Sequence, residues 1–154
     1  MKPITEESAL SRLANFCARA EYCIQDMRKK MSAWELSEEA QTRIIARLLK
    51  DRYIDENRYA HAFVRSKFRF NRWGRDKIRQ ALRLKGISDD DIADGLSEIQ
   101  SEESDTMLKE LLRKKSRTIK YNSDYERYMK LLRFAVSRGF SLDDARKAIE
   151  SMEG

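Results

Sequence analysis

The feature of this sequence that most constrains its fold is a short segment that recurs along the chain. Residues 78–96 shifted by 53 positions fall on residues 131–149, and both contain a basic residue, glycine, an apolar residue and serine, followed by acids: Lys85 to Ser88 and Arg138 to Ser141. Glycine suits the left-handed conformation that ends a helix. Serine with Asp three residues later suits the start of the next helix. The segment therefore predicts a helix–turn–helix joint that is used more than once.

A fainter copy of the segment lies near residues 27–45, where Glu35 stands in place of the glycine, so we expect that turn to be built differently. A further amphipathic helix precedes each copy, as apolar residues spaced three or four apart indicate. This divides the chain into three repeats at about residues 5–54, 55–100 and 101–154. Repeats of about 50 residues stack in a row. The sequence thus predicts an all-α, elongated array of three tandem three-helix repeats, forming a single helical domain over residues 1–154.

Composition excludes several other classes of protein. The 154 residues include only five Gly and one Pro, too few for the turns of a β-sandwich or β-barrel. The apolar residues are periodic and include six Phe, six Tyr and two Trp, which argues against disorder. No stretch approaches the roughly 18 apolar residues of a membrane span. The first residues carry two early acids and lack the apolar core of a signal peptide, so we expect a cytoplasmic protein.

The sequence contains no recognisable catalytic or metal-binding motif. His61 is the only histidine, and it lies between two alanines on an expected helix, where a surface position explains it better than general-base chemistry. Cys17 and Cys23 lack the further ligands of a zinc site, so we expect buried, reduced thiols. The run Asp89 to Asp91 caps a helix more readily than it chelates, because consecutive helical positions point in different directions. We expect no enzyme, no cofactor and no metal.

Charge is strongly segregated along the chain. Residues 65–85 hold nine basic residues and one acid, whereas residues 88–106 hold eight acids and no base. Basic residues can neutralise phosphates, and exposed aromatic residues within the block could stack on unpaired bases. Of the three aromatic residues there, Phe68, Phe70 and Trp73, we expect Phe68 and Trp73 in core or inter-repeat contacts rather than in stacking. Two interpretations stay open: a solvated helix face paired with the following acids, or a surface that meets phosphates or an acidic protein. The alternating signs favour a patterned protein partner over simple wrapping of duplex DNA.

Two segments of the middle repeat carry a family signature. Residues 53–68, YIDENRYAHAFVRSKF, follow the pattern Y-I-(D/N)-(D/E)-x-R-(F/Y)-A-x-x-(F/Y)-(V/I)-R, and residues 73–88 follow G-x-x-(K/R)-I-x-x-x-L-x-x-K-G-I. With the less specific segment CARAEYCIQDMRKKM at residues 17–31, where Cys23 occupies a position that is frequently Ser or Thr, they resemble the RecX family. Members of this family are bacterial regulatory proteins that modulate the RecA recombinase. The resemblance covers essentially the whole chain and is weakest in the third repeat.

This resemblance implies a curved array of three tandem three-helix repeats, in agreement with the internal repeat. It also implies binding to the RecA filament on single-stranded DNA, in or along its helical groove. The expected result is mostly inhibition of the recombinase, ATPase and coprotease activities, and thereby regulation of DNA repair and the SOS response. We further expect a monomer with weak affinity for single-stranded DNA, with duplex DNA as a further candidate ligand, and no membrane partner.

Particular residues follow from the motif. The matching positions of the middle repeat include Arg58, Tyr59, Ala60, Phe63, Gly74, Ile78, Leu82, Gly86 and Ile87. Ala60, Phe63, Ile78 and Leu82 are expected in the core, and Arg58 is expected either in an inter-repeat ion pair or in a contact with the partner. The residues expected to contact the filament or nucleic acid are all basic: Arg65, Lys67, Arg69, Arg72, Arg75, Lys77, Arg79 and Lys85.

Two other functions remain open on the sequence alone. A free-standing DNA-binding protein is one, because a helix–turn–helix is also a short three-helix unit. However, the third helix of each repeat begins with acids, which phosphates would repel. An adaptor repeat without RecA specificity is the other, and it would show no salt-dependent affinity for DNA or filament.

Overall fold

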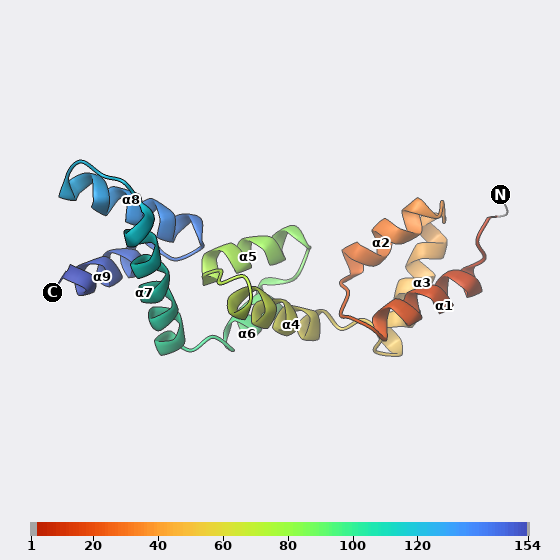
Figure 1. Ribbon diagram of the computed structural model, residues 1–154. Helices are drawn as coiled ribbons and strands as arrows, with labels where there is room; N and C mark the ends of the chain where they lie inside the picture. The colour runs from red at the N-terminus through yellow and green to blue at the C-terminus, as the bar shows by residue number, and fades with distance from the viewer. Residues whose placement is uncertain (1–2, 154) are drawn as a thin grey trace. The chain divides into compact units, whose positions relative to one another are not determined.

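The computed structural model describes residues 3–153, and every regular element in this range is an α-helix (Figure 1). The helices follow one another in three sets of three. The first set is α1 (Glu6–Cys17), α2 (Ile24–Ala33) and α3 (Glu38–Lys50), and the second is α4 (Glu56–Arg69), α5 (Arg75–Leu84) and α6 (Asp89–Leu96). The third is α7 (Ser101–Thr118), α8 (Asp124–Ser137) and α9 (Leu142–Glu153). The prediction of an all-α chain of tandem three-helix repeats is confirmed.

The helices form two compact units whose boundaries differ from those of the repeats. Among the described residues, the first structural unit contains residues 3–62 together with residues 82–95, and the second contains residues 63–81 together with residues 96–153. The division passes through α4 and α5, so each unit receives part of the middle repeat. The first unit includes the core of the first repeat, centred on Leu13, Met27 and Leu48. The second includes the core of the third repeat.

The recurring turn has the same hydrogen bonds in all three repeats. The backbone N–H groups of Leu36, Ile87 and Phe140 each donate to the carbonyl five residues earlier, at 3.1 Å in every case. The residue before each donor has a positive φ: 60° at Glu35, 78° at Gly86 and 99° at Gly139. These features define a Schellman-type helix end. A serine then begins the next helix, and the hydroxyls of Ser37, Ser88 and Ser141 each accept a backbone N–H from three residues on.

The expectation that the first turn would be built differently is wrong. Glu35 adopts the left-handed conformation that glycine adopts in the other two repeats, and the hydrogen bonds of the turn are retained. A Cβ atom in this conformation lies close to the following carbonyl oxygen, which costs about 1–2 kcal/mol. The packing of the first repeat therefore imposes the turn on a residue that does not favour it.

Most of the core predicted for the middle repeat is confirmed. Ala60, Ile78 and Leu82 are fully buried. Phe63 is an exception, because it is only half-buried and Lys67, one helical turn later, extends over its ring with the ammonium 5.5 Å from the ring centroid. The thiols also differ in part from expectation: both are free, but Cys17 is half-buried and only Cys23 is buried.

The shared turn leads to a paired prediction about stability. We expect Glu35→Gly to stabilise the fold by about 1 kcal/mol, because it removes the left-handed strain. Gly86→Ala should destabilise it by about 1–2 kcal/mol through the backbone conformation alone, since a Cβ at that position would meet nothing within 4 Å. Urea unfolding of both variants measures the two effects. A loss of stability in Glu35→Gly would show that the Glu35 side chain makes a larger contribution than its turn costs.

Candidate interaction surface of the middle repeat

Much of the basic block is already paired with groups of its own chain in the second structural unit. Four of the predicted contact residues have partners there. Arg65 Nη1 donates to both carboxylate oxygens of Glu98 (2.8 and 2.9 Å), and Arg72 Nη1 donates to Glu110 Oε2 (3.4 Å). Arg75 Nη2 donates to the Ile99 carbonyl (2.6 Å), and Arg79 Nη1 donates to Asp76 Oδ1 (2.8 Å). Three of these arginines have a carboxylate partner that an external anion would have to displace, whereas Arg75 donates to a neutral carbonyl and keeps its charge. Partly exposed pairs of this kind contribute little to stability, so such exchange is feasible.

Two lysines of the block share the indole ring of Trp73. The ammonium groups of Lys67 and Lys77 lie 4.9 Å and 4.5 Å from its ring centroid. Cations at this distance from an aromatic ring are attracted by its electron-rich face. Trp73 is half-buried, so it fixes two positive charges at the surface without neutralising either of them.

Arg69 and Phe70, at the end of α4 and just beyond it, are the most available residues of the block. Arg69 is exposed, and its guanidinium makes no hydrogen bond or ion pair with the residues that the structure describes. Phe70 is 85% exposed. Together with Lys67, Trp73 and Lys77 they form what we term the basic corner. An unpaired guanidinium beside an exposed aromatic ring can bind a phosphate and stack a base.

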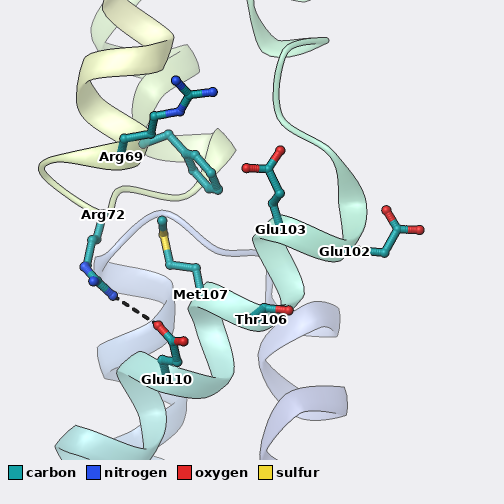
Figure 2. A pocket seen from close by; sticks show the side chains of 8 residues that line it. Arg69, Arg72, Glu102, Glu103, Thr106, Met107 and Glu110 are labelled. Atoms are coloured by element: carbon teal, nitrogen blue, oxygen red, sulfur yellow. Dashed lines mark hydrogen bonds and ion pairs between the residues drawn. The ribbon is translucent and has the colours of Figure 1, made fainter.

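An open groove of about 480 Å³ lies between the end of α4 and the first half of α7 (Figure 2). Phe68 and Met107 contribute apolar surface to it. Arg69 and Arg72 line one side, and carboxylates of α7 line the other: Glu102, Glu103 and Glu110. The Arg72–Glu110 ion pair joins the two sides. A groove that carries both signs of charge fits a protein surface with its own charge pattern better than a continuous polyanion.

The sequence alone did not identify the acidic side of this groove. Glu102 and Glu103 belong to the acidic tract of residues 88–106 and Glu110 lies beyond it, and nothing in their spacing indicates which of them face Arg69 and Arg72. Their partners are about 35 residues away along the chain and are set by tertiary packing. The regular alternation of basic and acidic blocks was the one indication of a mixed surface.

In the first structural unit, Lys85 has a structural role. Its ammonium donates to Asp26 Oδ1 at 2.8 Å, and the other Asp26 oxygen accepts the Cys23 backbone N–H at 3.3 Å. Burial alone would raise the pKa of Asp26, but the hydrogen bonds from Lys85 and Cys23 hold it below its ordinary value of 3.8. Burial also raises the pKa of the Cys23 thiol to about 11, which keeps the thiol unreactive at neutral pH.

Arg58, for which two roles were open, forms the inter-repeat ion pair. Its guanidinium binds the Glu21 carboxylate of the first repeat and donates to the carbonyls of Arg52 and Tyr53, both at 3.2 Å. The next residue, Tyr59, is buried, and burial raises the pKa of its phenol. His61 lies three residues after Arg58 on α4, with Nε2 2.9 Å from Asp94 Oδ2. These positions therefore hold elements of the first unit together.

Gly74 holds the middle repeat against the third within the second unit. Its backbone N–H donates to the Arg138 carbonyl at 2.7 Å, and that of Asp76 donates to the Gly139 carbonyl at 2.9 Å. A Cβ on Gly74 would lie 2.4 Å from the Gly139 oxygen. Arg138 also donates from its guanidinium to the Asn71 carbonyl at 2.7 Å. The φ of Gly74 is not positive, so this glycine is required for close backbone approach rather than for a turn.

Comparison with known proteins decides the family. A family model of the second three-helix domain of RecX matches residues 55–96, and a model of the third three-helix domain matches residues 102–149. Together the two models cover more than half of the chain. The chain belongs to the RecX family.

Individual RecX proteins are similar over most of this chain. "Regulatory protein RecX" of Leuconostoc mesenteroides is 31% identical over 142 residues, which are 92% of this chain and 53% of that protein. "Regulatory protein RecX" of Clostridium perfringens strain 13 is 33% identical over 121 residues, 77% of this chain and 56% of that protein. The chain thus spans about half the length of the curated relatives it matches.

Two crystal structures of RecX proteins share the fold. One, described as regulatory protein RecX, is 27% identical with a TM-score of 0.87, over 94% of this chain and 71% of that one. RecX from Lactobacillus salivarius is 20% identical with a TM-score of 0.85, over 96% of both chains. Within residues 3–153 of our RecX-family chain, no helix is long and apolar enough to cross a membrane.

The Gly74 contact yields a prediction about folding. Gly74→Ala places a methyl group against the backbone of residues 139 and 140, with no flexible side chain to move aside. We expect a loss of about 1–3 kcal/mol, as is typical of an overpacked site, together with faster amide hydrogen exchange at residues 74 and 76. The control is Gly86→Ala, in which the exchange of these two amides should remain slow. Unchanged exchange in Gly74→Ala would contradict the close-approach explanation.

The Asp26–Lys85 pair yields a prediction about pH. Because the pKa of Asp26 is lowered in the folded state, its contribution to stability is present above the unfolded value of 3.8 and is lost as the pH falls through the folded value. The difference in unfolding free energy between the wild type and Asp26→Asn should therefore shrink between about pH 6 and about pH 3. A difference that stays constant over this range would show that ionisation of Asp26 does not contribute to the stability of this junction.

Proposed function

We propose that this chain binds the RecA filament on single-stranded DNA and regulates it, mostly by inhibiting its recombinase, ATPase and coprotease activities. It would in this way regulate DNA repair and the SOS response in the cytoplasm. The observation that carries the proposal is membership of the RecX family, whose curated members are named regulatory proteins. The protein acts as a monomeric binding protein, without catalytic residues or a cofactor of its own.

The surface of the second structural unit supports this proposal on physical grounds. A filament of protein on single-stranded DNA offers phosphates and unpaired bases beside a protein wall with charges of both signs. The basic corner carries unpaired positive charge and an exposed aromatic ring, which suit the nucleic acid. The groove beside it carries both arginines and glutamates, which suit the protein wall. The two features share Arg69, so one docked partner can meet both.

Within the proposal, the contact residues differ in how available their charge is. Arg69, Lys67 and Lys77 present positive charge that no carboxylate neutralises at hydrogen-bond distance. Those paired with a carboxylate of their own chain would contribute only after exchange: Arg65, Arg72, Arg79 and Lys85. Arg75 donates to a neutral carbonyl and keeps its positive charge. Without RecA, the few available charges support only weak, salt-dependent binding to single-stranded DNA.

The decisive experiment is titration of the protein into a RecA ATPase assay on single-stranded DNA. We expect the wild type to inhibit the ATPase. A double variant, Arg69→Glu with Phe70→Ser, should require a protein concentration at least about tenfold higher for the same inhibition. Loss of one phosphate contact and one stacked base corresponds to about 1.4 kcal/mol or more. Both side chains are exposed, so the helical content should not change.

A matched control separates the basic corner from charge in general. Arg28→Glu with Leu84→Ser makes the same change in charge and also removes one exposed apolar side chain, since Leu84 is 76% exposed. This control should inhibit at the wild-type concentration. Wild-type protein without effect on the ATPase would overturn the proposed function. Equal inhibition by both double variants would leave the function in place but remove the basic corner from the contact surface.

A further inference from the structure

A second groove lies within the third repeat, between the C-terminal half of α7 and α8. Its volume is about 410 Å³, and the described residues that line it include three bases and no acid: Lys115, Ile119, Lys130, Arg133, Phe134 and Ser137. None of these residues belongs to the basic corner or to the groove beside it. The family signature in the middle repeat also does not include them.

The floor of this groove is apolar. Ile119 and Phe134 are half-buried and pack against the core of the third repeat. The Ser137 hydroxyl donates to the Phe134 carbonyl at 2.7 Å, so its proton is used within the helix. The floor therefore offers contact area for an apolar side chain and few hydrogen bonds.

The edge of the groove is positively charged. Lys130 pairs with Glu126 Oε1 at 3.1 Å and also donates to the Lys120 carbonyl. The Lys115 ammonium lies 5.1 Å from the Phe134 ring centroid. Arg133 is exposed, and its guanidinium has no hydrogen-bond or ion-pair partner among the described residues. Two of the three positive charges thus remain without a carboxylate partner.

We propose that this groove binds an acidic, amphipathic segment of a partner protein. Apolar side chains of the segment would lie on Ile119 and Phe134, and its carboxylates would meet Lys115, Arg133 and Lys130. An amphipathic helix placed in a groove between two helices is a common mode of peptide recognition. The charge of the edge and the apolar floor together define this ligand.

Single-stranded nucleic acid is the competing ligand, and the geometry fits it less well. A base stacks over most of an aromatic face, but Phe134, the one ring in the described lining, is half-buried. The two exposed tyrosines of this region, Tyr121 and Tyr125, which are 45% and 73% exposed, are not part of the groove lining. The proposal concerns a different repeat from the basic corner, so it can fail while the proposed function stands.

Fluorescence anisotropy with the full chain tests this inference. The probe is a labelled peptide of about 16 residues with Leu and Phe at helical i, i+3, i+4 and i+7 spacing and Glu elsewhere. A peptide of the same composition with scattered apolar residues is its control. The wild type should bind the patterned peptide at least several-fold more tightly than the scattered one.

Variants of the groove identify where the peptide binds. Arg133→Glu and, separately, Ile119→Ser should each weaken binding of the patterned peptide about fivefold or more. Arg146→Glu, an equal change in charge at an exposed position of α9, should leave binding unchanged. Circular dichroism checks that each variant keeps its helices.

Three results would overturn the inference. One is no binding of the patterned peptide by the wild type, and another is equal binding of the two peptides. The third is that Arg133→Glu weakens the binding of a single-stranded oligonucleotide of about 30 nucleotides but does not weaken the binding of the peptide. That third result would assign the groove to nucleic acid.

Discussion

The close approach of two backbone segments at Gly74 and Gly139 is the contact on which the candidate surface depends. Hydrogen bonds of 2.7 and 2.9 Å join the start of α5 to the turn between α8 and α9, and there is no room for a Cβ at either glycine. This contact holds the α4–α5 turn against the third repeat within the second structural unit. The α4–α5 turn contains Arg72 and places its guanidinium within reach of Glu110 on α7. The groove between α4 and α7, which we term the mixed-charge groove, therefore depends on two glycines that let two backbone segments meet.

The positive charges of the middle repeat serve two different purposes. Some hold the structure together, as Arg58 and Lys85 do in the first unit through Glu21 and Asp26. Others, such as Arg69, have no partner among the described residues and remain available. The alternation of basic and acidic blocks in the sequence thus reflects both interpretations that it left open. Part of the basic block is a helix face whose charges are paired, and part is a surface whose positive charges have no carboxylate partner among the described residues.

The periodic features of the fold were predictable from the sequence because they are local. Glycine and serine positions identified the turns and helix starts, and apolar spacing identified Ile78 and Leu82 as core residues. Glu35 shows the limit of this reasoning, since tertiary packing forces a left-handed conformation that local preference disfavours. Phe63 shows another, because Lys67 covers a ring that its spacing placed in the core.

The candidate site was predictable only in outline. The basic residues and the interleaved aromatic residues were identified, but which arginines are paired depends on acids 33 to 38 residues away along the chain, such as Glu98 and Glu110. The role of Gly74 also depends on a distant segment, although its place in the family motif marked it as important. The resemblance to RecX supplied the partner, which composition and spacing could not.

Hydrogen–deuterium exchange of this chain, alone and bound to RecA filaments on single-stranded DNA, tests the central claim most directly. The account predicts added protection in residues 66–77 and in the first half of α7, where the basic corner and the mixed-charge groove lie. Protection confined to the first repeat, with these segments unchanged, would contradict it.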